Sequence, residues 1–336
     1  MSDRSRQFES ELWSIGLFSA REEPEQLTDA VLAVANADRE GASLTLDVLV
    51  NGNAALAAEM HGRLSTGAWW KDGTTVRLWS IARGDKAHAW NHYLHSLMPD
   101  ANLAFFMDGY VTIERNALAL MASAIRERPQ ALAATSMPST GRSAASLRRR
   151  FLAEGGLHGN LYVLTRATTQ RLRDGGFRLP TGIYRNDSAL GAALAFNLDP
   201  RCNQWTWDRI AVVPDAQYRV PTADVTRLSD VRIHLRRRWR QAQGQLETLA
   251  LKAHLADAGR PPSAWPSTAR ELILDWANEH PSAARSLVWT DPLAWAALMN
   301  LRRTSEGAAP DGPAECLGQY SRSASIRRQP LAVSEY

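Results

Sequence analysis

Short apolar runs alternate with stretches of helical periodicity over the first 135 residues. Between the apolar runs, hydrophobic residues recur three and four positions apart, which is typical of amphipathic helices. The predicted helices begin at Pro24 and cover Ala54–Leu64, 85–97 and Glu114–Ile125. The predicted strands are Leu12–Phe18, Leu44–Val50, Thr74–Ile81, Asn102–Met107 and Gln130–Thr135. This alternation predicts an α/β fold with a mostly parallel central sheet flanked by helices.

The rest of the chain changes character twice. Residues 136–220 are less regular, with a small, polar stretch at Ser139–Ser146 that predicts a loop. Further elements are predicted at Leu161–Leu164, Ala167–Arg173, Asp187–Leu198 and Ile210–Val213. From about residue 224 the pattern is helical, with Pro281 as a break. We therefore expect an α/β domain over 1–225, a helical C-terminal extension over 226–303, and a disordered tail over 304–336, rich in Ser, Gly, Pro and Arg.

Composition narrows the class of protein. Hydrophobic residues make up 45% and charged residues 22% of the 336 positions, which is ordinary for a globular domain and excludes a collagenous or fully disordered chain. No apolar run is long enough to span a bilayer, and the N-terminus lacks the pattern of a secretory signal. Cys202 and Cys316 lie far apart without metal-type spacing. We therefore expect a cytoplasmic protein without disulfides.

Charge and aromatic content point to ligands rather than to a particular fold. The formal net charge is only +4, yet arginines are concentrated at 148–150 and 236–238. Such clusters face phosphates, anionic lipid or nucleic acid. Twelve tryptophans suit a protein that stacks on rings or sits at an interface.

The segments that follow the predicted strands are the places to look for a site, because ligands of parallel sheets bind at the carboxyl ends of the strands. These segments are Ser19–Glu23, Asn51–Asn53, Ile81–Lys86 and Asp108–Tyr110. Asp108 ends a buried strand, so its carboxylate needs a metal ion, a cationic side chain or a substrate hydroxyl. A turn-capping role for Asp108 explains the same residues equally well.

Lys86 and Asp187 each have two interpretations, one as a functional residue and one as an ordinary structural residue. Lys86 lies in the first turn of a helix that follows Gly84, where a cation and free backbone N–H groups favour a phosphate. A surface lysine is the plainer interpretation. Asp187 stands at the start of a predicted helix and is either an N-cap or a general base at the edge of the crevice.

In order along the chain, these segments resemble the motifs of family-2 glycosyltransferases of the GT-A fold. Phe18–Pro24 is similar to the family's P-A-R-N-E segment, and Val48–Asn53 to the end of its second strand. Gly84–Asn91 resembles G-K-A-x-A-x-N. Phe105–Val111 aligns with the strand that carries the D-x-D motif. The resemblance continues through Gly159–Tyr162 with Arg166, then Asn186-Asp187 in place of E-D, and Leu235–Trp239 in place of Q-x-x-R-W.

The resemblance implies an inverting transfer of a sugar from a nucleotide-sugar donor to a hydroxyl acceptor. Asp187 matches the catalytic base, and Asp108 would hold a divalent Mg²⁺ or Mn²⁺ ion. Arg238 and Trp239 match a motif that contacts acceptor or phosphate, although Trp239 also falls on the apolar stripe of its own helix. The donor-binding residues implied are Ser19, Ala20, Arg21, Glu23, Asn51, Lys86, Asp108 and Tyr110.

This sequence departs from the family pattern at several motif positions. Tyr110 replaces the second Asp of D-x-D, so a bridging metal would have one protein carboxylate fewer. Asn51, Asn186 and Leu235 also replace the usual residues. A catalytically inactive module that binds a nucleotide sugar or a partner protein is therefore the alternative to an enzyme.

The expected partners follow from the resemblance. They are a UDP- or GDP-type donor and a lipid-linked or soluble glycan acceptor, in the assembly of the cell envelope or an exopolysaccharide. The basic segment 231–240 could contact an anionic membrane at its inner face. Nucleic acid is not expected as a partner, because no recognition module is visible.

Overall fold

The computed structural model describes residues 11–66, 70–141, 144–221, 229–303 and 312–321. Its strands form one nine-stranded sheet in the order β5-β8-β6-β7-β4-β1-β2-β3-β9. The strands are β1 (Leu12–Ser19), β2 (Ser43–Asn51), β3 (Thr74–Ile81), β4 (Leu103–Asp108), β5 (Thr112–Ile113), β6 (Ala133–Pro138), β7 (Leu161–Thr165), β8 (Ile210–Arg219) and β9 (Glu315–Ser321). The central strands β4, β1, β2 and β3 are parallel, as their continuous apolar character predicts.

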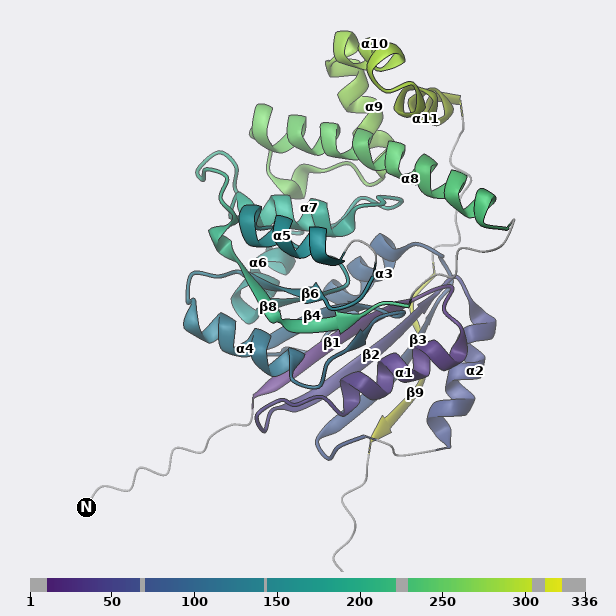
Figure 1. The fold of residues 1–336 in the computed structure, drawn as a ribbon, viewed down its shortest axis with the longest axis vertical. Coiled ribbons are helices and arrows are strands. Elements are labelled where there is room, and N and C mark those ends of the chain that lie inside the picture. Colours follow the sequence, from purple (N-terminus) through teal and green to yellow (C-terminus); the bar gives the residue numbers. More distant parts are fainter. Residues whose placement is uncertain (1–10, 67–69, 142–143, 222–228, 304–311, 322–336) are drawn as a thin grey trace, which may run out of the picture.

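Helices cover both faces of this sheet (Figure 1). One face packs against α1 (Pro24–Ala35), α2 (Ala54–Ser65) and α4 (Ala117–Glu127), whose buried residues belong to one core cluster. The other face packs against α3 (Lys86–His92), α6 (Arg166–Asp174) and α7 (Asn186–Ala195), whose buried residues belong to a second cluster. The predicted α/β class, with a central sheet between helical layers, is therefore confirmed.

The register of the parallel strands brings the predicted site segments to one edge of the sheet. Phe18 pairs with Asp108, and Ser19 pairs with Val50, which directly precedes Asn51. The carboxyl ends of β1, β2 and β4 are thus adjacent. Ser19, Asn51 and Asp108, distant in sequence, end neighbouring strands at this edge.

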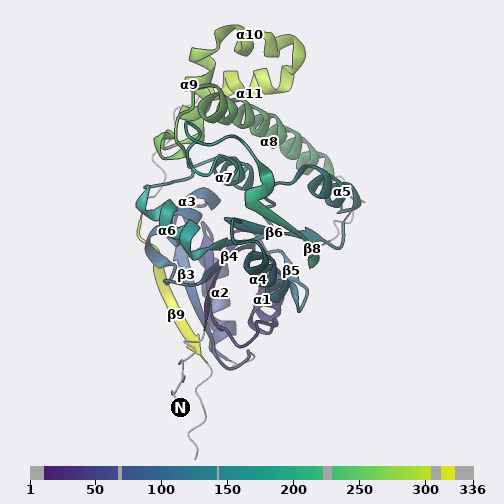
Figure 2. The same cartoon turned by 90° about the vertical axis from the view of Figure 1, so that its left-hand side faces the viewer.

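The C-terminal helices form a separate layer beyond α7 (Figures 1 and 2). The long helix α8 (Ser229–Lys252) contacts α7, and the helices α9 (Ala269–Glu279), α10 (Pro281–Thr290) and α11 (Pro292–Arg303) pack on α8 or on one another. No helix in the described ranges is long and apolar enough to cross a membrane.

Two predictions from the local pattern are wrong. Part of the stretch expected as a loop over Ser139–Ser146 belongs to helix α5 (Ala144–Glu154), where Ala, Leu and Arg outweigh the serines as helix formers. The tail expected to be disordered contains β9, which pairs antiparallel with β3. Composition gives no sign of this strand, because β9 is stabilised by pairing with β3, which lies some 240 positions earlier in the chain. The remaining tail residues, 304–311 and 322–336, lie outside the described residues.

Candidate functional site

Asp108, at the end of β4, is buried and has both carboxylate oxygens engaged. The Lys86 ammonium contacts Oδ1, and the Tyr110 hydroxyl donates to Oδ2 at 3.0 Å. Tyr110 also lies 3.0 Å from the side-chain oxygen of Asn160. Of the partners predicted for this acid, the structure provides a lysine. The Tyr110 that replaces an acid of the family motif serves as a hydrogen-bond donor to Asp108.

Asp187, in the first turn of α7, lies on the same side of the molecule as Asp108. The backbone N–H of Gly159 donates to Asp187 Oδ2 at 3.0 Å. The next residue, Asn160, accepts a hydrogen bond from the Asp108 N–H through its carbonyl oxygen at 3.1 Å. The short segment before β7 thus connects both acids. A Cβ atom on Gly159 would lie 3.1 Å from the Asp187 Cβ, so this position favours glycine.

The charges of Asp108 and Asp187 influence the pKa values of the same three side chains, Tyr110, Tyr218 and His158. Burial raises the pKa of Tyr110 and of Tyr218, and the negative charges of both Asp108 and Asp187 add to the effect. Burial lowers the pKa of His158, against the opposite influence of the same two acids. His158 Nδ1 lies 3.0 Å from the Tyr218 hydroxyl. Asp108 and Asp187 therefore flank one polar site, in which burial favours the neutral form of His158.

Glu22 organises the loop after β1. Glu23, and not Glu22, is among the donor-binding residues expected from the sequence. The Glu22 carboxylate accepts hydrogen bonds from the Ser19 hydroxyl at 2.7 Å and from the N–H groups of Ala20 and Arg21 at 2.7 and 2.9 Å. The Ser-x-x-Glu spacing, typical of a capping box, was the available signal. Arg21 and Glu23 are exposed beside this loop, while Ser19 is buried.

Asn51 connects the loops at the carboxyl edge. Its buried amide can donate to the Ser19 carbonyl oxygen at 2.6 Å and accept from the Asp85 N–H at 3.3 Å. The next residue, Gly52, has a φ of 69°, and a Cβ there would lie 2.4 Å from the Gly84 Cα. The loops after β2 and β3 therefore touch through glycines, and Lys86, two residues after Gly84, contacts Asp108 at the end of β4.

The first turn of α3 is occupied by side chains of the protein. Asp85 Oδ1 accepts the His88 N–H at 2.7 Å, and the Asn186 amide can accept the Ala87 N–H at 3.3 Å. These two N–H groups are therefore engaged within the protein, and the phosphate site predicted at Lys86 stays a prediction. The Asn186 contact also joins α7 to α3, because Asn186 is the first residue of α7 and Ala87 belongs to α3.

The side chains present do not fit a metal held by the protein alone. In the described part of the chain, no cluster of three or more His, Cys, Asp or Glu residues could ligate an ion. At Asp108, a metal would have to displace Lys86 from one oxygen and Tyr110 from the other. It would then need further ligands from a bound donor. The metal site predicted at Asp108 stays a prediction.

Arg238 and Trp239, predicted to contact acceptor or phosphate, are exposed on α8. Trp239 has 36% of its surface accessible, so it is not a fully buried core residue. Neither residue lines the cavity that opens beside Asp187, which is described in the next paragraph. In the basic segment 231–240, the side chains of 231–237 lie outside the described residues, and the predicted membrane contact stays a prediction.

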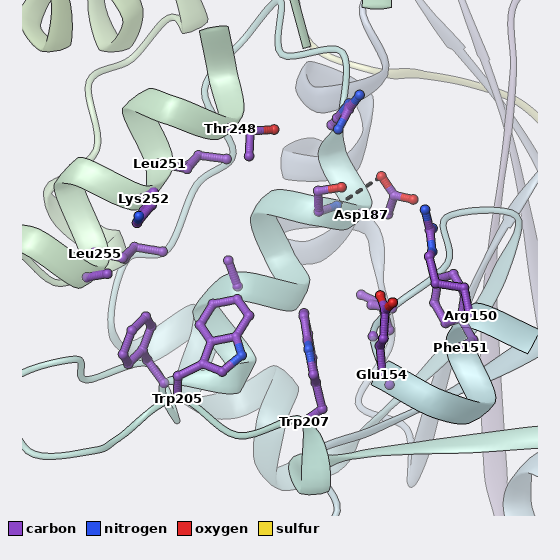
Figure 3. A pocket seen from close by; sticks show the side chains of 18 residues that line it. Arg150, Phe151, Glu154, Asp187, Trp205, Trp207, Thr248, Leu251, Lys252 and Leu255 are labelled. Atoms are coloured by element: carbon purple, nitrogen blue, oxygen red, sulfur yellow. Dashed lines mark hydrogen bonds between the residues drawn. The ribbon is translucent and has the colours of Figure 1, made fainter. Parts of the chain in front are cut away.

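A cavity of about 540 Å³ opens beside Asp187 (Figure 3). Its lining comes from α5, α7, the end of α8 and the loop before β8, with Asp187 on one wall and Trp205 and Trp207 on another. Asp108 does not belong to the lining. The cavity therefore reaches the polar site from the side of Asp187. The sequence offered little signal for it, since the start of α5 was expected as part of a loop and the tryptophans lie outside every motif.

Glu247 of α8 anchors the segment that leads into α7. Its fully buried carboxylate accepts the backbone N–H groups of Tyr184 at 2.9 Å and Arg185 at 3.1 Å. Gly244 lies one turn earlier, and a Cβ there would be 2.7 Å from the Arg185 Nε, so glycine permits the close approach. Glu247 thus fixes the backbone that leads into α7, two residues before Asp187.

Glu247 should make folding stability depend on pH. Burial raises the pKa of its carboxyl to about 7, from an ordinary value of 4.5. Between pH 4.5 and 7 the folded protein therefore binds more protons than the unfolded chain. We expect the free energy of unfolding to fall as pH rises through this window, by up to about 1.4 kcal/mol per pH unit. Chemical denaturation of wild type and Glu247→Gln across this range measures the effect, because the variant lacks the titrating group. Parallel pH profiles of the two proteins would contradict this assignment.

Known proteins resemble this chain in structure rather than in sequence. No protein-family model matches it, and neither does any curated protein sequence. The mannosyltransferase PcManGT from Pyrobaculum calidifontis, solved with GDP-Man and Mn²⁺, is 17% identical, with a TM-score of 0.50 over 87% of this chain and 86% of that one. Residues 1–349 of S. aureus TarS are 13% identical, with a TM-score of 0.51 over 86% and 80%. The same fragment with UDP-GlcNAc is 11% identical, with a TM-score of 0.50. The chain therefore shares the fold of these proteins.

Proposed function

We propose that this protein is an inverting glycosyltransferase that uses a nucleotide-sugar donor. The observation that carries the proposal is the placement of Asp108 and Asp187 on one polar site, joined through Gly159 and Asn160, at the carboxyl edge of the sheet. The shared fold adds support, because two of the similar structures hold GDP-Man or UDP-GlcNAc.

In the proposed reaction, an acceptor hydroxyl attacks the anomeric carbon of the donor sugar. The bond from that carbon to the diphosphate oxygen breaks, and its electron pair leaves with the nucleoside diphosphate. Asp187 takes the hydroxyl proton as general base. One carboxylate base is sufficient for a single displacement, which inverts the anomeric configuration.

The donor would occupy the loops around Asp108. Lys86 supplies positive charge where the leaving diphosphate gains negative charge, and Tyr110 holds the Asp108 carboxylate in place. The nucleoside would lie along the loops after β1 and β2, against Ser19, Ala20, Arg21, Glu23 and Asn51. A UDP- or GDP-linked hexose is the donor class that we propose.

The acceptor and its pathway come from the family resemblance. We propose a lipid-linked or soluble glycan acceptor, in envelope or exopolysaccharide assembly on the cytoplasmic side of the membrane. Arg238 and Trp239, exposed on α8, remain candidates for contact with a long acceptor or with an anionic membrane surface.

A donor panel tests the proposal. Purified protein is incubated with UDP- and GDP-sugars, and the release of nucleoside diphosphate is followed with and without acceptor. We expect slow hydrolysis of one donor class, which an acceptor accelerates. The alternative, an inactive module, is favoured by the replaced acid of D-x-D. Saturable binding of a nucleoside diphosphate without turnover of any donor would establish that alternative.

A further inference from the structure

The cavity beside Asp187 is lined mainly by apolar side chains, several of them aromatic. Phe151 and Leu157 form one side, and Leu251 and Leu255 close another. Each of these four side chains is at most 5% exposed, so the wall belongs to the protein core. Seven polar residues also line the cavity, and most of them lie at exposed positions. They are Arg150, Glu154, Arg185, Asp187, Ser188, Thr248 and Lys252.

The tryptophan wall is built into the fold. The rings of Trp205 and Trp207 meet edge to face with centroids 4.7 Å apart, and Phe196 meets Trp205 in the same manner at 5.2 Å. Gly155, with a φ of 77°, allows Trp207 to approach, since a Cβ there would lie 2.5 Å from the Trp207 Cβ. A packed aromatic wall of this kind is a preformed surface for a ligand.

Trp205 is 45% exposed although its ring faces an apolar cavity. Figure 3 shows the tryptophans opposite Leu251 and Leu255, with Asp187 at the far end of the space between them. An exposed aromatic ring beside an apolar cavity is typical of a binding site rather than of a folding core. Asp187, the proposed general base, lies at one end, so the reacting hydroxyl of a ligand belongs there.

We propose that this cavity binds the apolar aglycone of an amphiphilic acceptor, such as an alkyl or aryl glycoside, whose hydroxyl meets Asp187. This inference rests on the proposed function, because Asp187 selects the hydroxyl only as a general base. The aliphatic part of the wall suits the aglycone better than the hydroxyls of an oligosaccharide. Those hydroxyls would lose water against Leu251, Leu255 and Phe196 without hydrogen-bond partners there.

Binding of alkyl glucosides tests this inference without any turnover. Isothermal titration calorimetry compares methyl and octyl β-D-glucoside, both below the micelle concentration, so that the ratio of dissociation constants isolates the alkyl group. We expect octyl glucoside to bind at least about tenfold more tightly than methyl glucoside. Trp205→Ala, which removes part of the wall, and Ala256→Trp, which fills the cavity from an exposed position, should reduce the preference to about threefold or less.

Trp289→Ala is the matched control, because Trp289 lies on α10, is 87% exposed and does not line the cavity. Thermal unfolding verifies that each variant is folded. A wild-type ratio near one, or equal ratios in all three variants, overturns the inference. Donor turnover is measured on the same wild-type protein. If the protein turns over a donor but shows no preference for octyl glucoside, only the cavity inference is rejected. If it prefers octyl glucoside but turns over no donor, the proposed function is rejected, and the cavity remains a binding site for alkyl groups.

Discussion

Replacing Asp187 with Asn is expected to lower the turnover number for glycosyl transfer by about a thousandfold, within the range that general bases contribute. The amide has nearly the shape of the carboxylate but cannot accept the proton of the acceptor hydroxyl. The single amide oxygen can still accept the Gly159 N–H, which donates to Oδ2 at 3.0 Å in the wild type, while the Ser188 N–H, which donates to Oδ1 at 2.9 Å, loses its acceptor. Because the donor loops are untouched, the affinity for nucleoside diphosphate should stay within about threefold of wild type.

Two measurements check this expectation: steady-state transfer with saturating donor, and calorimetric binding of the nucleoside diphosphate. Asp174→Asn is the matched control, since Asp174 is an exposed acid at the end of α6, away from the site. Turnover of Asp187→Asn equal to that of Asp174→Asn would remove Asp187 from the mechanism. A fall in nucleotide affinity as large as the fall in turnover would assign it a role in donor binding.

The carboxyl edge of the sheet could be predicted because it depends on local signals. Short apolar runs such as 103–107 form buried parallel strands, and the residue after each strand must lie at the same edge. Asp108 and Asn51 are predictable in this manner, because each stands at the end of an apolar run. Lys86 followed from the Gly-Asp-Lys start of a helix, and it does lie beside Asp108.

The contacts that orient Asp187 could not be predicted, because they join distant parts of the chain. Gly159 lies 28 positions before Asp187, and Glu247 lies 63 positions after the Tyr184 N–H that it accepts. A buried glutamate on a helix with many charges carries no periodic signal. The same holds for Trp205 and Trp207, whose wall exists only once α5, α7 and α8 have assembled around it.

The motif resemblance indicated which residues to consider, but it could not predict which side chains surround them. Tyr110, which stands where the resembled motif has a second acid, donates to Asp108, and no pattern of one sequence could indicate this contact. The segment that matched Q-x-x-R-W places Trp239 at the surface of α8 rather than against the cavity. The substitution at 110 and the lysine at 86 together suggest how the site can operate with one acid at this position.

Removing the Lys86 ammonium is expected to reduce kcat/KM for the donor by about 100- to 1000-fold. The ammonium contacts Asp108 in the free protein, at the strand end where we propose that the donor diphosphate binds. In Lys86→Ala the leaving group loses this positive charge, and the unpaired Asp108 carboxylate repels the diphosphate. Because Lys86 and Tyr110 already hold both Asp108 oxygens, wild-type activity should stay within about threefold after treatment with EDTA.

The measurement is donor turnover by wild type and variants, each with and without EDTA. Lys71→Ala is the matched control, since Lys71 pairs with Asp38 at 3.0 Å on another part of the surface and should behave as wild type. If EDTA abolishes wild-type turnover while Lys86→Ala matches Lys71→Ala, a divalent ion at Asp108 supplies the charge instead. If both treatments reduce turnover, the ion and the lysine act together, and the claim of metal independence is wrong. Only the loss in Lys86→Ala, with EDTA without effect, identifies Lys86 as the cation that meets the leaving diphosphate.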